Sequence, residues 1–263
     1  MSKVKIVYLI FLILAIIFSL VGWVILKGAL FNGSATEGVI IVSSIFLMLG
    51  VALGLIFILF DNLWLLVLAP TASVALSFIF FGLHPVYLVI FVVGTGLVVF
   101  AASQSLKEKK AHIKVSLTEI VKPALGAIFT FLALTISAVI YFSPPAQGIS
   151  VNIKVPRSLF NFVLSSMASV APNGLVSFDQ ILNKDMEDKL YQAINNQINF
   201  FLQPYKRYLP YGLAIAVFLS LKAVSFIFVW IAIGLINLVF SGMKKIGWVN
   251  IKKEMVEKET LEF

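Results

Sequence analysis

Hydrophobic positions dominate this chain in long runs, separated by short polar turns and by one long polar stretch. A helix that crosses a bilayer needs about 20 consecutive apolar residues. Six runs approach or exceed that length, at residues 6–26, 39–60, 63–81, 85–102, 123–142 and 211–240. We therefore expect an all-α polytopic membrane protein with six transmembrane helices. The last run is longer than a bilayer requires and is expected to tilt or to project beyond the membrane.

Turn and proline signals separate the runs. Asp61 and Asn62 form a tight turn between the second and third runs, and Pro85 suits the first turn of the fourth. Pro70 lies inside the third run and is expected to kink its helix.

The long polar stretch, residues 143–210, lies between the last two runs and is called the insert below. Its second half reads as a helix, with Ser177 as N-cap, Gln180 three residues later in a capping-box pattern, and Pro204 at the end. Six apolar residues recur three or four positions apart and would form one apolar stripe along this helix. The stripe comprises Leu182, Met186, Leu190, Ile194, Ile198 and Phe201.

An apolar stripe on a polar insert must be covered by something. The first half of the insert offers a short alternating strand at residues 149–155 and an apolar, Ser-rich segment up to residue 170. Cover by residues 149–170 is one interpretation. A second copy of the chain, another envelope protein, or the membrane surface are the alternatives.

The distribution of Lys and Arg predicts the orientation, because basic residues favour cytoplasmic loops. With the N-terminus inside, the cytoplasmic segments hold twelve lysines and the short outer loops hold only Lys27. We expect a multi-pass protein of the plasma (cytoplasmic) membrane with cytoplasmic N- and C-termini and an extracytoplasmic, α-rich insert between helices 5 and 6. Aromatic residues fall at the proposed outer boundaries, where amphipathic rings settle: Trp23, Tyr87, Tyr141, Tyr208 and Tyr211.

The chain is thereby divided into four parts. Residues 1–104 form a four-helix transmembrane bundle, and residues 105–122 are expected to form a cytoplasmic interfacial helix. Residues 123–240 hold spans five and six around the insert, and residues 241–263 form a cytoplasmic tail.

Composition supports the membrane assignment and limits the chemistry. The 263 residues are 60% hydrophobic and only 12% charged, with no Cys and a net charge of +8. The lysines cluster beside spans, which suits anionic lipid, so nucleic acid is not expected as a partner. Without Cys there are no disulfides or thiolate metal sites, and two isolated His do not make a metal centre. We expect no cofactor.

Few residues inside the spans offer distinctive chemistry. Lys222 is the only charge well inside a span, and it either snorkels to the outer interface or lines an ion or substrate path. Ser220 and Ser225 flank it, but a Ser/Lys dyad also needs correct geometry. Gly50 and Gly54 form a Gly-x-x-x-Gly motif that permits close helix packing.

The function that this pattern favours is a non-enzymatic scaffold or accessory subunit of a cell-envelope complex, presenting the insert to a partner. The partner is the bilayer together with another envelope protein or a second copy of the chain. The alternative is a small-solute transporter or channel with a path near Lys222, Asn237 and Pro70. A membrane-embedded enzyme is the third reading, which lacks an acid/base constellation.

Overall fold

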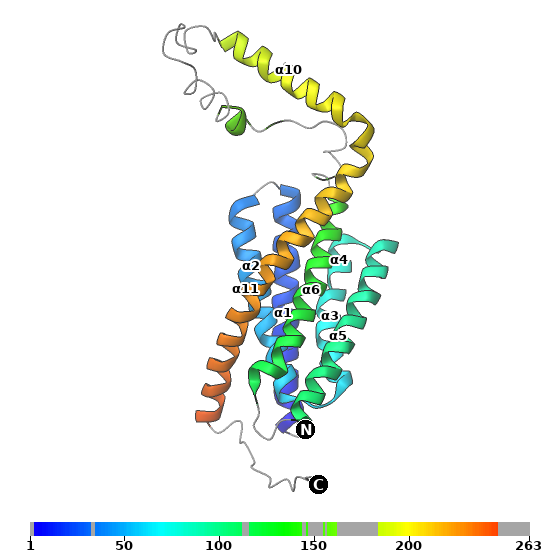
Figure 1. Ribbon diagram of the computed structural model, residues 1–263. Coiled ribbons are helices and arrows are strands. Elements are labelled where there is room, and N and C mark those ends of the chain that lie inside the picture. Colours follow the sequence, from blue (N-terminus) through cyan, green and yellow to red (C-terminus); the bar gives the residue numbers. More distant parts are fainter. Residues whose placement is uncertain are drawn as a thin grey trace, which may run out of the picture. The chain divides into compact units, whose positions relative to one another are not determined.

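Helices make up nearly all of the protein that the computed structural model describes (Figure 1). It describes residues 3–32, 35–111, 116–143, 146, 155, 157–161 and 184–246. The helices are α1 (Lys3–Asn32), α2 (Ala35–Leu59), α3 (Leu63–Ala75), α4 (Ser77–Phe81), α5 (Pro85–Ala111), α6 (Leu117–Tyr141), α10 (Lys184–Leu202), the 3-10 helix η1 (Gln203–Tyr208) and α11 (Leu209–Lys245). The chain divides into two compact units, residues 1–140 with 214–263, and residues 141–213.

Six helical stretches of the described residues are long and apolar enough to cross a membrane. They are Ile6–Phe31, Ile40–Leu59, Leu63–Phe81, Pro85–Lys110, Leu117–Tyr141 and Leu209–Lys245. The expected all-α architecture with six such helices is confirmed for this part of the chain. By length and composition, these helices are compatible with a multi-pass membrane protein.

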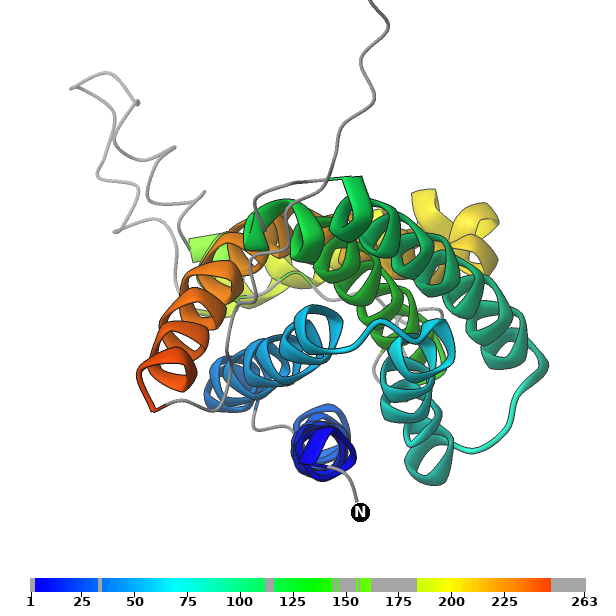
Figure 2. The ribbon, with the colours of Figure 1, turned by 90° about the horizontal axis from the view of Figure 1, so that it is seen from below.

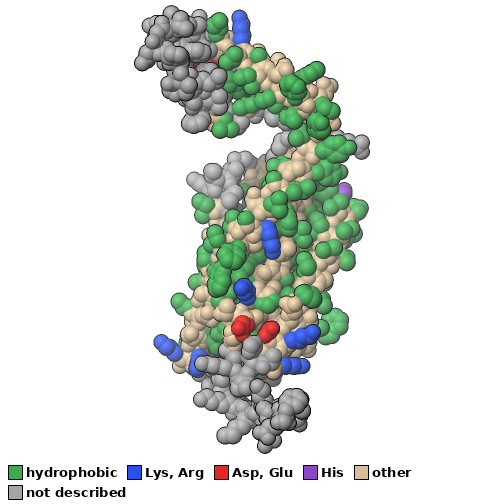
Figure 3. Space-filling view, in the orientation of Figure 1, with side chains coloured by type: hydrophobic (Ala, Val, Ile, Leu, Met, Phe, Trp, Pro, Cys, Tyr) green, Lys and Arg blue, Asp and Glu red, His purple; other side chains and the backbone are tan. Residues whose placement is uncertain are grey.

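The first unit is built around α2 and α6. In α2 and α6, 61% of the residues in the apolar stretch are buried, whereas in α1, α5 and α11 only 28% are. Viewed along the bundle, α2 lies between α1 on one side and α6 and α11 on the other (Figure 2). The outer helices therefore present most of their surface to the surroundings, and apolar side chains cover much of the face shown in Figure 3. Val92 on α5 is 70% exposed and Ile227 on α11 is 57% exposed, as expected for side chains that face lipid.

The third span is interrupted at Leu76, between α3 and α4, and Pro70 lies within α3, where the expected kink stays a prediction. The Ser73 carbonyl accepts hydrogen bonds from the Ser19 hydroxyl and from the Trp23 indole N–H, 3.1 Å away, both on α1. Trp23 was expected at the lipid interface, but its side chain is fully buried. Its indole N–H satisfies a backbone acceptor beside the interruption, which explains why it turns inward.

The expectation of a separate interfacial helix at residues 105–122 is wrong. α5 continues to Ala111 and α6 begins at Leu117, so most of the segment extends the two spans. The two ends are tied together, because the buried Ser105 hydroxyl donates to the Ile120 carbonyl at 2.7 Å. Charged residues continue a helix when its apolar side still packs, and Ile120 is 2% exposed.

The last turn of α5 also closes the tight turn between α2 and α3. Lys109 Nζ lies 2.6 Å from the Phe60 carbonyl oxygen and 2.7 Å from Asp61 Oδ1. Asn62 is the N-cap of α3 and its side chain accepts from the Trp64 N–H at 2.9 Å. The turn role expected for Asp61 and Asn62 is therefore what this geometry shows.

The helical chain from Lys184 to Lys245 has no loop in it. α10 ends at Leu202, two residues before Pro204, η1 follows, and α11 begins at Leu209. α11 extends to Lys245, five residues into the predicted tail of 241–263. The predicted helix start at Ser177 and all but Val155 of the predicted strand 149–155 lie outside the described residues.

Candidate functional site

The apolar stripe of the insert is largely exposed on α10. Met186 is 55% exposed, Leu190 43%, Ile194 38% and Phe201 64%. Ile198 is partly buried, and Leu182 lies outside the described residues. Side chains of this kind are usually buried, so the stripe is an apolar surface on an otherwise polar helix.

A different side of α10 is held by the first half of the insert. The Val155 N–H donates to Asn195 Oδ1 at 2.7 Å, and the Tyr191 hydroxyl donates to the Val155 carbonyl at 2.6 Å. The Asn195 amide in turn donates to the Tyr191 carbonyl at 2.7 Å, and Asn195 is only 8% exposed. These bonds satisfy both backbone groups of Val155. We call this arrangement of Val155 on Tyr191 and Asn195 the clasp.

Two further contacts extend the clasp along α10. Arg157 forms an ion pair with Asp188 at 2.8 Å, and its guanidinium lies 5.2 Å from the centre of the Tyr191 ring. Phe160 packs edge-on against Tyr191, with ring centres 5.3 Å apart, and is 6% exposed. The ion pair is exposed and contributes little. The aromatic pair, in which Phe160 is buried, contributes more.

The clasp and the stripe occupy different faces of α10. Tyr191 and Asn195 each follow a stripe residue, Leu190 or Ile194, by one position, which is about 100° around a helix. The described part of residues 149–170 therefore covers the clasp face and leaves Leu190 and Ile194 exposed. The other residues of 149–170 lie outside the described part of the chain, so cover of the stripe by that segment stays a prediction.

Exposed aromatic residues gather where α10 leads into α11. They are Phe200, Phe201, Tyr205, Tyr208 and Tyr211, each between 53% and 70% exposed. Tyr211 lies 4.8 Å from Tyr141, measured between ring centres, at the end of α6. Such a collection beside the ends of two apolar helices is typical of a membrane–water interface.

Lys222 lies on the exposed side of α11 and its Nζ donates to the Thr130 hydroxyl on α6. That hydroxyl donates to the Gly126 carbonyl at 2.6 Å. The neighbouring serines are engaged with their own helix: Ser220 donates to the Ala216 carbonyl and Ser225 to the Lys222 carbonyl. Lys222 thus connects α11 to α6, and neither the Ser220 nor the Ser225 hydroxyl donates to its amine.

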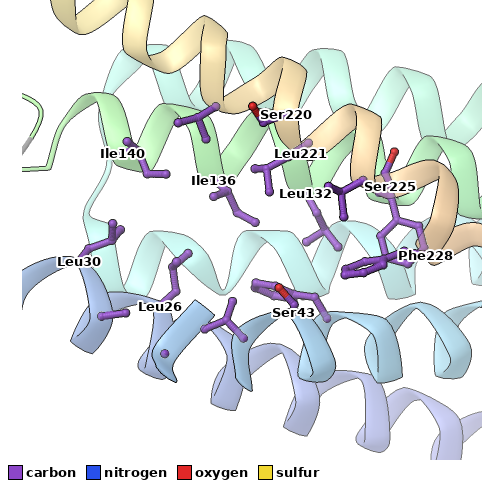
Figure 4. A pocket seen from close by; sticks show the side chains of 18 residues that line it. Leu26, Leu30, Ser43, Leu132, Ile136, Ile140, Ser220, Leu221, Ser225 and Phe228 are labelled. Carbon is purple, nitrogen blue, oxygen red and sulfur yellow. The ribbon is translucent and has the colours of Figure 1, made fainter. Parts of the chain in front are cut away.

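A pocket of about 420 Å³ lies between α1, α2, α6 and α11 in the first unit. Side chains from the four helices converge on it (Figure 4), including Leu26, Leu132, Ile136 and Leu221. Its polar lining side chains are serines: Ser43, Ser220 and Ser225. Sequence reasoning missed this pocket, because no single helix carries a signal for a space formed by four.

Gly50 and Gly54 lie where α2 meets α6 and α11. A Cβ on Gly50 would come 2.6 Å from Phe129 Cζ, and one on Gly54 would overlap Ile236. Both glycines therefore lie against side chains of α6 and α11 within the first unit.

Among the described residues, no group of three or more His, Asp or Glu is placed to hold a metal ion. No family model, no curated protein and no solved structure matches this chain.

Proposed function

We propose that the protein is a non-enzymatic scaffold or accessory subunit of a cell-envelope complex, which presents its insert to a partner protein. The observation that carries this proposal is the exposed apolar stripe of α10, at Met186, Leu190, Ile194 and Phe201. Four large apolar side chains on one helix face are a common way to bind a complementary groove.

The clasp supports the same function, because a docking surface works best when it is rigid before binding. The buried amide of Asn195 and the packing of Phe160 on Tyr191 hold Val155 and Phe160 against α10. That contact supports the helix from one side while the stripe remains available on another.

The proposed location is the plasma membrane, with both termini cytoplasmic. Basic residues support this orientation: the last turns of α5 and α11 carry Lys109, Lys110, Lys244 and Lys245. Both helices end at the same end of the first unit (Figure 1). Clustered lysines at one end of a bundle favour the cytoplasmic side, and the insert would then lie outside.

The transporter alternative has less support. A transport path needs polar groups that accept a solute, but the pocket is lined by apolar side chains and three serines. Lys222 is not among the residues that line the pocket, and it hydrogen-bonds to Thr130.

A photo-crosslinking amino acid at Ile194 tests the proposal, with the same amino acid at the exposed polar position Asn196 as a matched control. In intact cells, we expect a discrete crosslinked protein from position 194 and much less of it from position 196. Adding Leu190→Asp, which puts a charge into the stripe, should abolish the crosslink while the chain still reaches the membrane.

Equal crosslinking from both positions, or a crosslink that survives Leu190→Asp, would refute a docking role for the stripe. Crosslinks to lipid alone would assign the stripe to the membrane surface instead.

A further inference from the structure

We propose that the pocket between α1, α2, α6 and α11 is a binding site for one acyl chain of a bilayer phospholipid. The site is separate from the α10 stripe, so this proposal does not depend on the proposed function.

The shape of the pocket suits a single chain that runs parallel to the helices. On α11 its lining extends from Val217 to Phe228, and on α2 from Gly38 to Phe46. At 1.5 Å per residue these stretches are about 16 Å and 12 Å long. One leaflet of the hydrocarbon core is about 15 Å thick, which matches the pocket to the chain of one leaflet.

Aromatic rings close one end of the pocket. Phe46, Phe129 and Phe228 come from three different helices, and the rings of Phe129 and Phe228 pack with their centres 6.2 Å apart. Leu30 and Ile140 lie at the opposite end (Figure 4), and Leu30 is two residues before the end of α1. The acyl chain of the lipid therefore enters at the end marked by Leu30 and Ile140, and its terminal methyl group lies against the phenylalanine rings.

The chemistry of the lining excludes a polar ligand. Ser220 and Ser225 already donate to carbonyls of their own helix. The other lining side chains are apolar except for Ser43, so a polar ligand would lose its hydrogen bonds with water and gain few in return. An acyl chain has no hydrogen bonds to lose and gains van der Waals contact with the pocket walls.

The packing of α11 explains why the pocket exists. The half of α11 nearer its C-terminus packs on the core through Val229, Ala232, Ile233 and Ile236. Before Phe228 the helix is more exposed, with Val224 at 44%. The pocket lies beneath this less packed half of α11.

Photolabelling tests the site directly. The protein is reconstituted in vesicles of phosphatidylcholine that carries a diazirine at the terminal carbon of one acyl chain, and adducts are mapped by peptide mass spectrometry. Phe46 and Phe129 are each only 5% exposed, so lipid at the outer surface cannot label them efficiently. We expect adducts at these two residues at least as strong as at the exposed Val92 on α5.

Two matched substitutions on α11 complete the test. Ser220→Phe fills the pocket from its exposed α11 wall, whereas Ala223→Phe adds the same ring to an exposed position that does not line it. Ser220→Phe should lower labelling of Phe46 and Phe129 about tenfold, and Ala223→Phe should leave it unchanged. Labelling that simply follows side-chain exposure, or that falls equally in both variants, would overturn the proposal and leave boundary lipid only.

Discussion

Asn195 is the residue on which the clasp depends most. It is a buried amide that accepts from the Val155 N–H and donates to the Tyr191 carbonyl. A buried donor left without its partner costs about 1–3 kcal/mol, and removal of Asn195 would leave the half-buried Val155 N–H without its partner, at a cost toward the lower end of that range.

Asn195→Ala should therefore release residues 155–161 from α10. Hydrogen exchange of the peptide that contains these residues should become about tenfold faster, as a loss of about 1.4 kcal/mol implies. The exposed neighbour provides the control, since Asn196→Ala leaves the clasp intact. If both variants exchange like the unaltered protein, the side chain of Asn195 does not hold the segment.

At the scale of helices, α5 and α6 can pack closely because α5 carries a glycine, Gly94, at their contact. A Cβ on Gly94 would overlap the ring of Phe131, which is 1% exposed. Two residues along α5, a Cβ on Gly96 would meet nothing within 4 Å. The two glycines therefore have opposite roles, although the sequence alone presents them as one Gly-Thr-Gly unit.

Gly94→Ala should destabilise the protein by about 1–3 kcal/mol, the usual cost of overpacking a filled interior. Gly96→Ala should leave stability unchanged or raise it, because Ala favours a helix over Gly by up to about 1 kcal/mol. Thermal unfolding in mild detergent, followed by tryptophan fluorescence, measures both as shifts in Tm. A Tm for Gly94→Ala equal to that of Gly96→Ala would show that α5 and α6 separate without cost.

At the scale of the whole molecule, the proposed orientation distributes the charges across the membrane. The chain has no Cys, so a single introduced cysteine is a unique reporter of sidedness. Asn196 on α10 and Lys110 on α5 are both exposed and would lie on opposite sides.

A cysteine in Asn196→Cys should react with an impermeant maleimide in intact cells, whereas Lys110→Cys should react only after the membrane is permeabilised. This result follows if the lysine-rich ends of α5 and α11 face the cytoplasm. The reverse pattern would place both termini outside and invert the proposed topology.

Sequence patterns predicted the elements of this fold better than the contacts between them. Apolar runs located six spans because the bilayer imposes a length on each, and Pro204 located the end of α10 because a proline inside the helix would remove a hydrogen bond. For residues 105–122 the prediction is wrong, because the lysines are typical of a surface helix whereas Ser105 and Ile120 pack inside the bundle. The division of α10 into clasp and stripe depends on where Val155 lies in space, which no local pattern encodes.

The turn between α2 and α3 has a consequence for biosynthesis. Phe60 and Asp61 reach the membrane well before their partner Lys109, which follows 49 and 48 residues later in the chain. A connection as short as Phe60–Asn62 would let α2 and α3 insert together as one hairpin before the end of α5 has been synthesised. The ion pair between Lys109 and Asp61 could then form only after α5 is complete.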